Sequence, residues 1–151
     1  MKPLDAEFWP QLPADLRDFA VQPRPVQPLA RRVDVYLKAN FRQACRLSQI
    51  ARNVGSSVRV MTAAFKREHH CTIHQYLSLL RLRAAVRLLI ESDLKIAAIS
   101  ESVGWNSQAD FYRHLHRFAS LSPGAARVDM QNASMLLARL DEWLCSRGLF
   151  V

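Results

Sequence analysis

The sequence predicts an all-α protein in which two helix-turn-helix units are joined by a long linker helix and followed by an extra C-terminal helix. Three observations support this fold class. No glycine or proline occurs between Leu29 and Val54, and only Gly104 occurs between Gly55 and Pro123, so helix-breaking residues are scarce. Apolar residues in these stretches recur three and four positions apart, the spacing of one helix face. A nine-residue pattern also occurs twice.

Local signals mark the ends of several expected helices. Thr72 and Gln75 have the spacing of a capping box, in which each side chain satisfies a free backbone N–H. Ser57 and Ser107 each follow a glycine-containing turn and open a helix. The expected helices cover residues 29–40, 46–53, 57–69, 73–91, 95–102, 107–118 and 131–146.

The expected helix over residues 73–91 carries one apolar stripe, which predicts that one side of it is buried. We expect Arg81, Arg83 and Arg87 to lie away from this stripe, in intramolecular ion pairs or in solvent. The stripe consists of Ile73, Tyr76, Leu77, Leu80, Ala84, Leu88 and Leu89.

The composition divides the chain into three parts. Six of the seven prolines lie in residues 1–28, and their fixed φ and missing N–H predict an arm or linker there. Residues 29–129 form the predicted domain of two helix-turn-helix units. Residues 130–151 contain an amphipathic helix, whose apolar face either packs on the domain or pairs with a second copy or a partner protein.

The positive charge lies in the middle part. The chain has 21 Lys and Arg against 13 Asp and Glu, a net charge of +8, and 17 of the cations are Arg. Residues 29–129 alone hold sixteen cations and seven acids. Arg forms forked contacts with phosphates and base edges. The charge therefore favours a nucleic-acid partner, although a basic protein without one remains an alternative.

Several other classes of protein do not fit the sequence. Cys45, Cys71 and Cys145 are an odd number without a close-spaced framework, which argues against a disulfide scaffold. No apolar run approaches the roughly 18 residues of a membrane span. The first residues do not resemble a signal peptide. We therefore expect a cytoplasmic, nucleoid-associated protein.

The sequence does not indicate an enzyme. It contains no paired carboxylates, nucleophile elbow or phosphate-binding glycine loop, and we expect no cofactor. His70, Cys71 and His74 are close together, but a zinc site usually needs four ligands. We therefore expect no metal.

The repeated pattern is the most informative feature. Leu47 to Gly55 recurs as Ile96 to Gly104, forty-nine residues later, and both copies have the form apolar-x-x-Ile-small-x-x-Val-Gly. The apolar residues share one helix face, the small residue permits close helix crossing, and glycine supplies a left-handed turn. This is the pattern of a helix-turn-helix. The alternative, an ordinary bundle of helical hairpins, leaves the matched glycines unexplained.

This pattern belongs to a wider set of matching motifs. Residues 103–113 are the most specific, with Trp105 after the glycine and Ser107 before the second helix. Residues 31–127 thus resemble the DNA-binding domain of the AraC/XylS family of bacterial transcription regulators. The matching stretches are Leu47 to Gly55, Phe65 to Arg67, Gln75 to Leu77, Arg81 to Ala85, Leu88-Leu89, Ile99 to Phe118, Ser122-Pro123 and Arg127.

The resemblance implies a sequence-specific double-stranded DNA-binding regulator, with RNA polymerase as a further partner. The helix over residues 73–91 is about 27 Å long at about 1.5 Å per residue. It is a plausible spacer for two recognition helices in major grooves about 34 Å apart. One monomer would read two half-sites, so the expected target is asymmetric.

The resemblance also implies which residues contact DNA. Arg forks onto guanine and Gln onto adenine in the major groove, and phosphates are held by cations and by donors at helix starts. The implied base-contacting residues are Arg59, Thr62, Gln108, Tyr112 and Arg113. The expected phosphate-contacting residues are Ser57, Lys66, Arg67, Ser107 and Arg117.

The sequence departs from the family pattern at four positions. His70 and Ser120 stand where glycine is expected, Ala126 replaces an aromatic residue, and Ala63 replaces a polar reader. We therefore expect the second unit to supply most of the affinity. We expect no effector domain of the kind that many relatives carry within these 151 residues, so either regulation acts through abundance, or the chain is a fragment, or another protein supplies the signal. The alternative function is a protein-interaction module or an antagonist of related regulators that has lost strong DNA binding.

Overall fold

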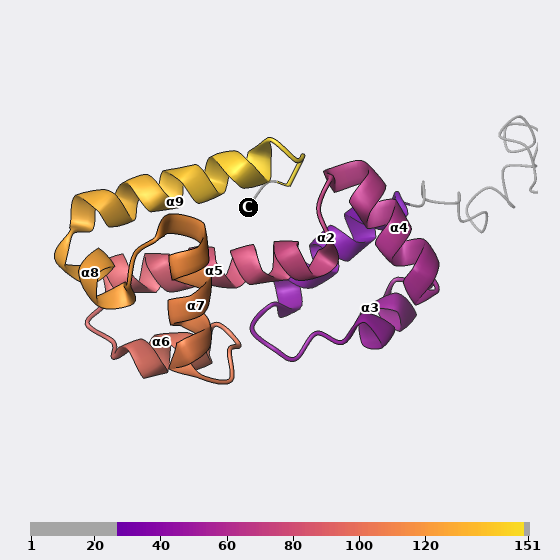
Figure 1. Ribbon diagram of the computed structural model, residues 1–151. Coiled ribbons are helices and arrows are strands. Elements are labelled where there is room, and N and C mark those ends of the chain that lie inside the picture. The colour runs from indigo at the N-terminus through magenta and orange to yellow at the C-terminus, as the bar shows by residue number, and fades with distance from the viewer. Residues whose placement is uncertain (1–26, 150–151) are drawn as a thin grey trace, which may run out of the picture.

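The computed structural model describes residues 27–149, which form helices joined by loops and contain no strand (Figure 1). The arm predicted over residues 1–28 lies outside the described residues except for its last two positions. The predicted all-α fold class is confirmed. Within the described residues, no helix is long and apolar enough to cross a membrane. The helices are α2 (Leu29–Asn40), α3 (Leu47–Asn53), α4 (Val58–His69), α5 (Ile73–Glu91), α6 (Ile96–Ser102), α7 (Gln108–Ala119), α8 (Pro123–Val128) and α9 (Met130–Cys145).

Two helical units lie at opposite ends of α5 (Figure 1). Helices α2 to α4 form unit 1, and helices α6 to α8 form unit 2. In both units the Ile of the repeated pattern, Ile50 or Ile99, is completely buried. The pattern ends at Gly55 and Gly104, which have φ of 66° and 93°. The predicted pair of helix-turn-helix units is therefore present.

The single apolar stripe predicted for α5 is wrong in part, because α5 is covered on more than one side. Leu82, Ala85 and Val86 are buried although they lie outside the predicted stripe. Ala84 and Leu88, which belong to it, are only half-buried. Helices α6, α7, α8 and α9 all pack against α5, and a helix surrounded by neighbours has no single buried face.

Among residues 27–149, helix α8 is the one element that the sequence pattern missed. It has only six residues, too few for apolar periodicity to be detected. The sequence nevertheless contains a signal for its start. The Ser122 hydroxyl accepts a hydrogen bond from the Ala125 N–H, and Pro123 occupies the first turn. Serine as N-cap followed by proline is a common helix start.

Helix α9 lies along α5 and contributes to the cores of both units (Figure 1). Leu136 and Leu140 are buried with the residues of unit 2. Leu144 and Leu149 are buried with those of unit 1. The apolar face of α9 is thus occupied within the chain itself, which does not favour a homodimer through this helix.

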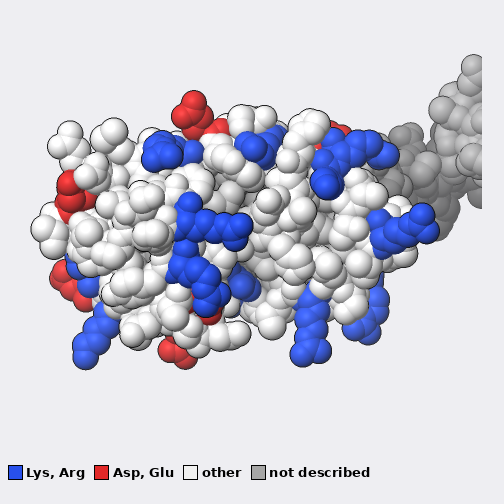
Figure 2. Space-filling model, viewed as in Figure 1, with Lys and Arg blue, Asp and Glu red and all other residues white. Residues whose placement is uncertain are grey.

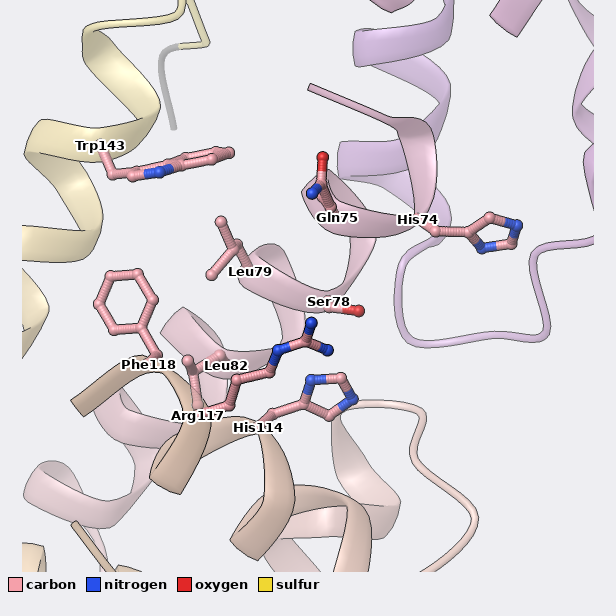
Figure 3. Close-up of a pocket in the computed structure, with 9 residues that line it drawn as sticks. All are labelled: His74, Gln75, Ser78, Leu79, Leu82, His114, Arg117, Phe118 and Trp143. Atoms are coloured by element: carbon pink, nitrogen blue, oxygen red, sulfur yellow. The ribbon is translucent and has the colours of Figure 1, made fainter. Parts of the chain in front are cut away.

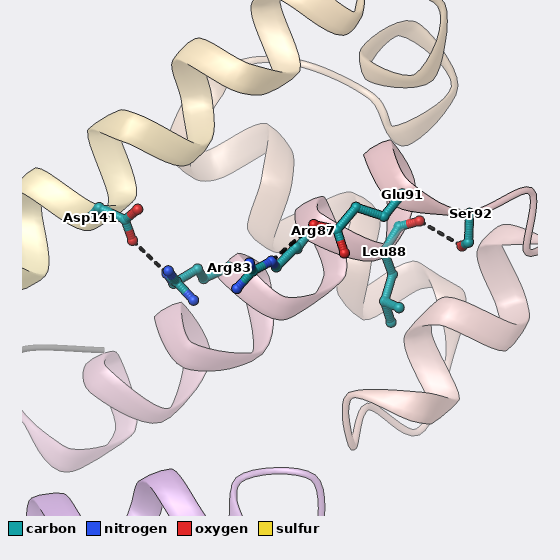
Figure 4. Close-up of polar contacts among 6 residues, drawn as sticks. All are labelled: Arg83, Arg87, Leu88, Glu91, Ser92 and Asp141. Carbon is teal, nitrogen blue, oxygen red and sulfur yellow. Dashed lines mark hydrogen bonds and ion pairs between the residues drawn. The ribbon is translucent and has the colours of Figure 1, made fainter.

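An ion pair fastens α9 to the middle of α5 (Figure 4). Arg83 Nε lies 2.5 Å from Asp141 Oδ1, and the Arg83 side chain is only 17% exposed. Arg87 instead pairs with Glu91 on the exposed side of α5. Both contacts are intramolecular ion pairs, as expected for these arginines.

A second set of contacts joins the two units on another side of α5. Arg81 donates from Nε to the Phe41 carbonyl and from Nη2 to the Gln43 carbonyl, both at 2.8 Å. Arg81 was expected in an ion pair or in solvent, but it binds backbone oxygens of the loop between α2 and α3. The turn at Gly104 touches the same loop, because a Cβ on Gly104 would lie 2.6 Å from the Arg42 carbonyl oxygen.

A buried hydrogen bond ties α2 to the start of α5. Tyr76 donates its hydroxyl to Asp34 Oδ1 at 2.6 Å, and Lys38 pairs with the other carboxylate oxygen at 3.0 Å. Burial, together with the hydrogen bond to Asp34, raises the pKa of Tyr76. The buried Asp34 carboxylate thus has a polar partner for each of its two oxygens, which offsets the cost of burying its charge.

Candidate nucleic-acid interface

Helix α4, the second helix of the first helix-turn-helix motif, has one buried face and one exposed face. Met61 and Phe65 are completely buried and anchor it to unit 1. Its start is fixed by the Ser57 hydroxyl, which accepts from the Val60 N–H at 3.2 Å. The exposed side chains of α4 include Arg59, Ala63, Lys66 and Arg67, together with Val58, Val60 and Glu68.

Thr62 differs from the other predicted base-contacting residues. It is half-buried, and its hydroxyl points back to its own helix, at 2.8 Å from the Val58 carbonyl and 3.2 Å from the Arg59 carbonyl. The hydroxyl proton is therefore used within α4 and is not presented to a base.

Helix α7 repeats this arrangement in unit 2. Phe111 and Leu115 are completely buried, and the side chains on the opposite face can reach a partner. Tyr112 is 43% exposed. The exposed side chains of α7 are Gln108, Ala109, Tyr112, Arg113, His116 and Arg117.

Asp110 organises the start of α7, a role that was not predicted. Its carboxylate lies 3.2 Å from Arg113 Nη1 and accepts from the Ser107 hydroxyl at 3.3 Å. Ser107 is the N-cap residue, but its side chain does not cap the helix. The spacing of three residues on either side of Asp110 was a signal available in the sequence.

Trp105 positions α7 against the turn that precedes it. Its ring stacks on His114, with centroids 5.4 Å apart and planes 6° from parallel, and on Phe111 at the same separation. Burial lowers the pKa of His114, so the imidazole that faces Trp105 is neutral at neutral pH. These contacts hold the buried side of α7 and leave its other side exposed.

On the face of the molecule seen in Figure 2, Lys and Arg side chains lie over both units. Lys and Arg lie over the middle of this view, where α7 is located, and around unit 1. Asp and Glu lie mainly towards the edges. Such a distribution suits a polyanionic partner laid across both units.

Comparison with known proteins identifies the type of domain. A family model described as a helix-turn-helix domain matches residues 50–128, more than half of the chain. The chain belongs to the AraC/XylS family of transcription regulators. A probable thc operon regulatory protein from Rhodococcus erythropolis is 33% identical over 106 residues, which are 70% of this chain and 31% of that protein. The melibiose operon regulatory protein of Escherichia coli K12 is 25% identical over 88 residues, 58% of this chain and 29% of that protein.

Solved structures of family members share the fold of this AraC/XylS protein. The C-terminal domain of AraT, a response regulator from Geobacillus stearothermophilus, superposes with a TM-score of 0.65 at 25% identity, over 70% of this chain and 88% of that one. The DNA-binding domain of AdpA, solved in complex with a target DNA, has a TM-score of 0.63 at 25% identity, over 69% and 93%. The chain spans about a third of the length of the curated relatives that it matches.

Two residues at positions where glycine was expected adopt the left-handed backbone conformation. His70 and Ser120 end the two recognition helices with φ of 54° and 55°. This is the left-handed conformation that glycine adopts most easily after a helix. Both side chains are exposed. A residue other than glycine at these positions therefore adds backbone strain but does not alter the path of the backbone.

His70, Cys71 and His74 do not form one cluster. Cys71 is buried in the core of unit 1, whereas His70 and His74 are exposed. Within the described part of the chain, no group of three or more His, Cys, Asp or Glu could hold a metal ion.

Proposed function

We propose that this AraC/XylS family member is a sequence-specific double-stranded DNA-binding transcription regulator that reads two adjacent major-groove half-sites with α4 and α7. The observation that carries the proposal is the pair of exposed helix faces held on one central helix. Helix α5 has 19 residues and is about 27 Å long. That length is compatible with grooves about 34 Å apart on one side of DNA.

The proposed base contacts come from both recognition helices. Arg59 in α4, and Gln108, Tyr112 and Arg113 in α7, are exposed near the helix starts, where side chains of a helix-turn-helix reach base edges. Thr62 lies on the same side of α4. We expect it to contribute through packing, since its hydroxyl is engaged with the α4 backbone.

The proposed phosphate contacts surround these positions. The Ser57 hydroxyl accepts a hydrogen bond from Val60 and keeps its own proton for a phosphate oxygen. Lys66, Arg67 and Arg117 are exposed at the flanks and ends of the recognition helices, where their charges can neutralise phosphates without reading the sequence. Ser107 is exposed at the start of α7, and its hydroxyl would donate to a phosphate oxygen in place of Asp110, its partner in the free protein.

Selection of bound sequences from a random duplex library tests the proposal. We expect an asymmetric site with two half-sites about 10 base pairs apart, as for recognition helices one DNA turn apart. Affinity for the selected duplex should fall steeply with salt, because each neutralised phosphate releases counterions. Failure to enrich any sequence, with no salt-dependent binding, would contradict the proposal and favour the alternative of a protein-interaction module.

The two units should contribute unequally to DNA binding. We expect Arg113→Ala to weaken binding to the selected duplex more than Arg59→Ala, because Asp110 holds the Arg113 guanidinium in place before binding. A base contact by Arg is worth about 1–3 kcal/mol of discrimination. Fluorescence anisotropy titrations of both variants measure the difference, and equal losses would show that the units contribute equally.

A further inference from the structure

A groove with both aromatic and cationic walls lies between α5, α7 and α9 (Figure 3). Its volume is about 410 Å³, within the roughly 300–1,000 Å³ of small-molecule sites. Trp143 comes from α9, Arg117 and Phe118 come from α7, and Leu79 comes from α5. Three helices that are distant in the sequence thus meet at one hollow.

One side of the groove is lined by apolar side chains, although outside this lining Arg147 lies 3.6 Å from the centre of the Trp143 ring and Arg139 lies 5.7 Å from that of Phe118. Phe118 and Trp143 lie on the same side of Leu79 in Figure 3, and both rings are half-buried. Leu82, which is 1% exposed, forms part of the floor. Such surfaces favour a flat hydrocarbon or aromatic body, and a DNA phosphate would gain nothing from them.

The other side of the groove is cationic. The Arg117 side chain extends from α7 towards Ser78 (Figure 3). Arg117 is absent from the four ion pairs among the described residues, and no Asp or Glu lines the groove. His114 lies beside Arg117, and burial lowers its pKa, which leaves the guanidinium as the main charge. A carboxylate is the group that a guanidinium binds in a forked geometry.

We propose that this groove binds a small, planar, amphipathic carboxylate. Its carboxylate pairs with Arg117, and its apolar body packs against Phe118, Trp143 and Leu79. Trp143 lies outside residues 50–128, the region matched by the family model, so the site depends on the additional helix α9.

Ligand binding would also affect DNA binding, a consequence that rests on the proposed function. Arg117 is one of the proposed phosphate contacts, and a carboxylate bound to it removes that contact. Ligand and DNA therefore compete, and by linkage each lowers the affinity for the other by the same factor.

Isothermal titration calorimetry of the full chain without DNA tests the site, with naphthoate and its neutral counterpart naphthamide as probes. We expect naphthoate to bind with a dissociation constant below about 1 mM, and naphthamide to bind about tenfold more weakly because it lacks the charge. Arg117→Met keeps much of the side-chain volume and should weaken naphthoate binding by a similar factor. Arg31→Met removes an exposed cation in α2 and should leave it unchanged.

Two results would overturn the site. One is no measurable heat of naphthoate binding at millimolar concentration. The other is an equal loss in Arg117→Met and Arg31→Met, which would mean that the anion binds to net charge alone. Circular dichroism of both variants verifies that they are folded.

A separate titration tests the competition. Naphthoate should raise the apparent dissociation constant of the wild-type chain for its selected duplex and have no such effect on Arg117→Met. An unchanged constant in the wild type would overturn the competition. Absence of any selected duplex would contradict the proposed function, while the calorimetry without DNA would still decide the ligand site.

Discussion

Gly55 and Gly104 occupy the same place in the repeated pattern but face different surroundings. Both have positive φ, so both favour glycine for conformational reasons. A Cβ on Gly55 would meet only the end of the Arg32 side chain at 4.0 Å, whereas a Cβ on Gly104 would meet the Arg42 carbonyl oxygen at 2.6 Å. The second glycine is therefore also required by the contact between the units.

We predict that Gly104→Ala destabilises the protein more than Gly55→Ala. The Gly55 variant carries only the backbone strain of about 1–2 kcal/mol, while the Gly104 variant must also displace the loop between α2 and α3. Urea denaturation followed by circular dichroism measures both free energies of unfolding. Equal losses of unfolding free energy in the two variants would mean that the loop between α2 and α3 can move aside without destabilising the protein.

His70 is a residue in a conformation that suits glycine. We predict that His70→Gly stabilises the protein by up to about 1 kcal/mol, because it removes left-handed strain at an exposed position. Ala63→Gly, at an exposed position in the middle of α4, serves as the control and should destabilise by about 1 kcal/mol. Thermal unfolding of both variants checks the prediction, which fails if His70→Gly lowers the melting temperature.

At the scale of elements, α9 determines how the units are held together. Its buried leucines divide between the two cores, and its Asp141 binds Arg83 at the middle of α5. The loop between α2 and α3 makes the other connection, because it is bound to α5 by Arg81 and also contacts the turn at Gly104 in unit 2. Unit 1 and unit 2 are therefore joined by two separate sets of contacts in addition to α5 itself.

We predict that Leu140→Ala and Leu144→Ala each lower the free energy of unfolding by about 2–5 kcal/mol, the usual cost of a cavity at a buried leucine. Both side chains are completely buried, one in each core. Met135→Ala, on the same helix but 59% exposed, should change it by less than about 0.5 kcal/mol. Denaturant titrations measure all three. Small effects at both leucines would show that α9 is not part of the cores.

At the scale of the whole molecule, the fixed relation between the units has a consequence for DNA. Recognition helices held at one separation can engage two half-sites at one spacing only. We predict that insertion of about 5 base pairs, half a DNA turn, between the selected half-sites reduces affinity to that of a single half-site. Anisotropy titrations measure this, with the same insertion outside the site as the control. Unchanged affinity would show that the units move independently.

Neighbouring residues in the sequence are sufficient to specify most of the helices and the exposed faces. The seven expected helices are present with ends within one residue of the expected positions. The signals that predict these features are local. Residues within about two helical turns are enough to predict the cap at Thr72, the turn at Gly55 and the inward-facing position of Ile50. For the same reason, the exposure of Arg59 and Arg113 followed from the periodicity of their own helices.

Contacts between distant parts of the chain could not be predicted in this way. Arg81 binds a carbonyl 40 residues earlier, and Arg83 binds Asp141 58 residues later. Many side chains satisfy the local pattern equally well, and only the packing of α9 and the α2 to α3 loop against α5 selects among them. The groove at Arg117 and Trp143 likewise exists only where three helices meet. Periodicity and capping depend on residues that are close in the sequence. Which distant side chains come into contact depends instead on how whole helices pack together and bury their apolar surfaces.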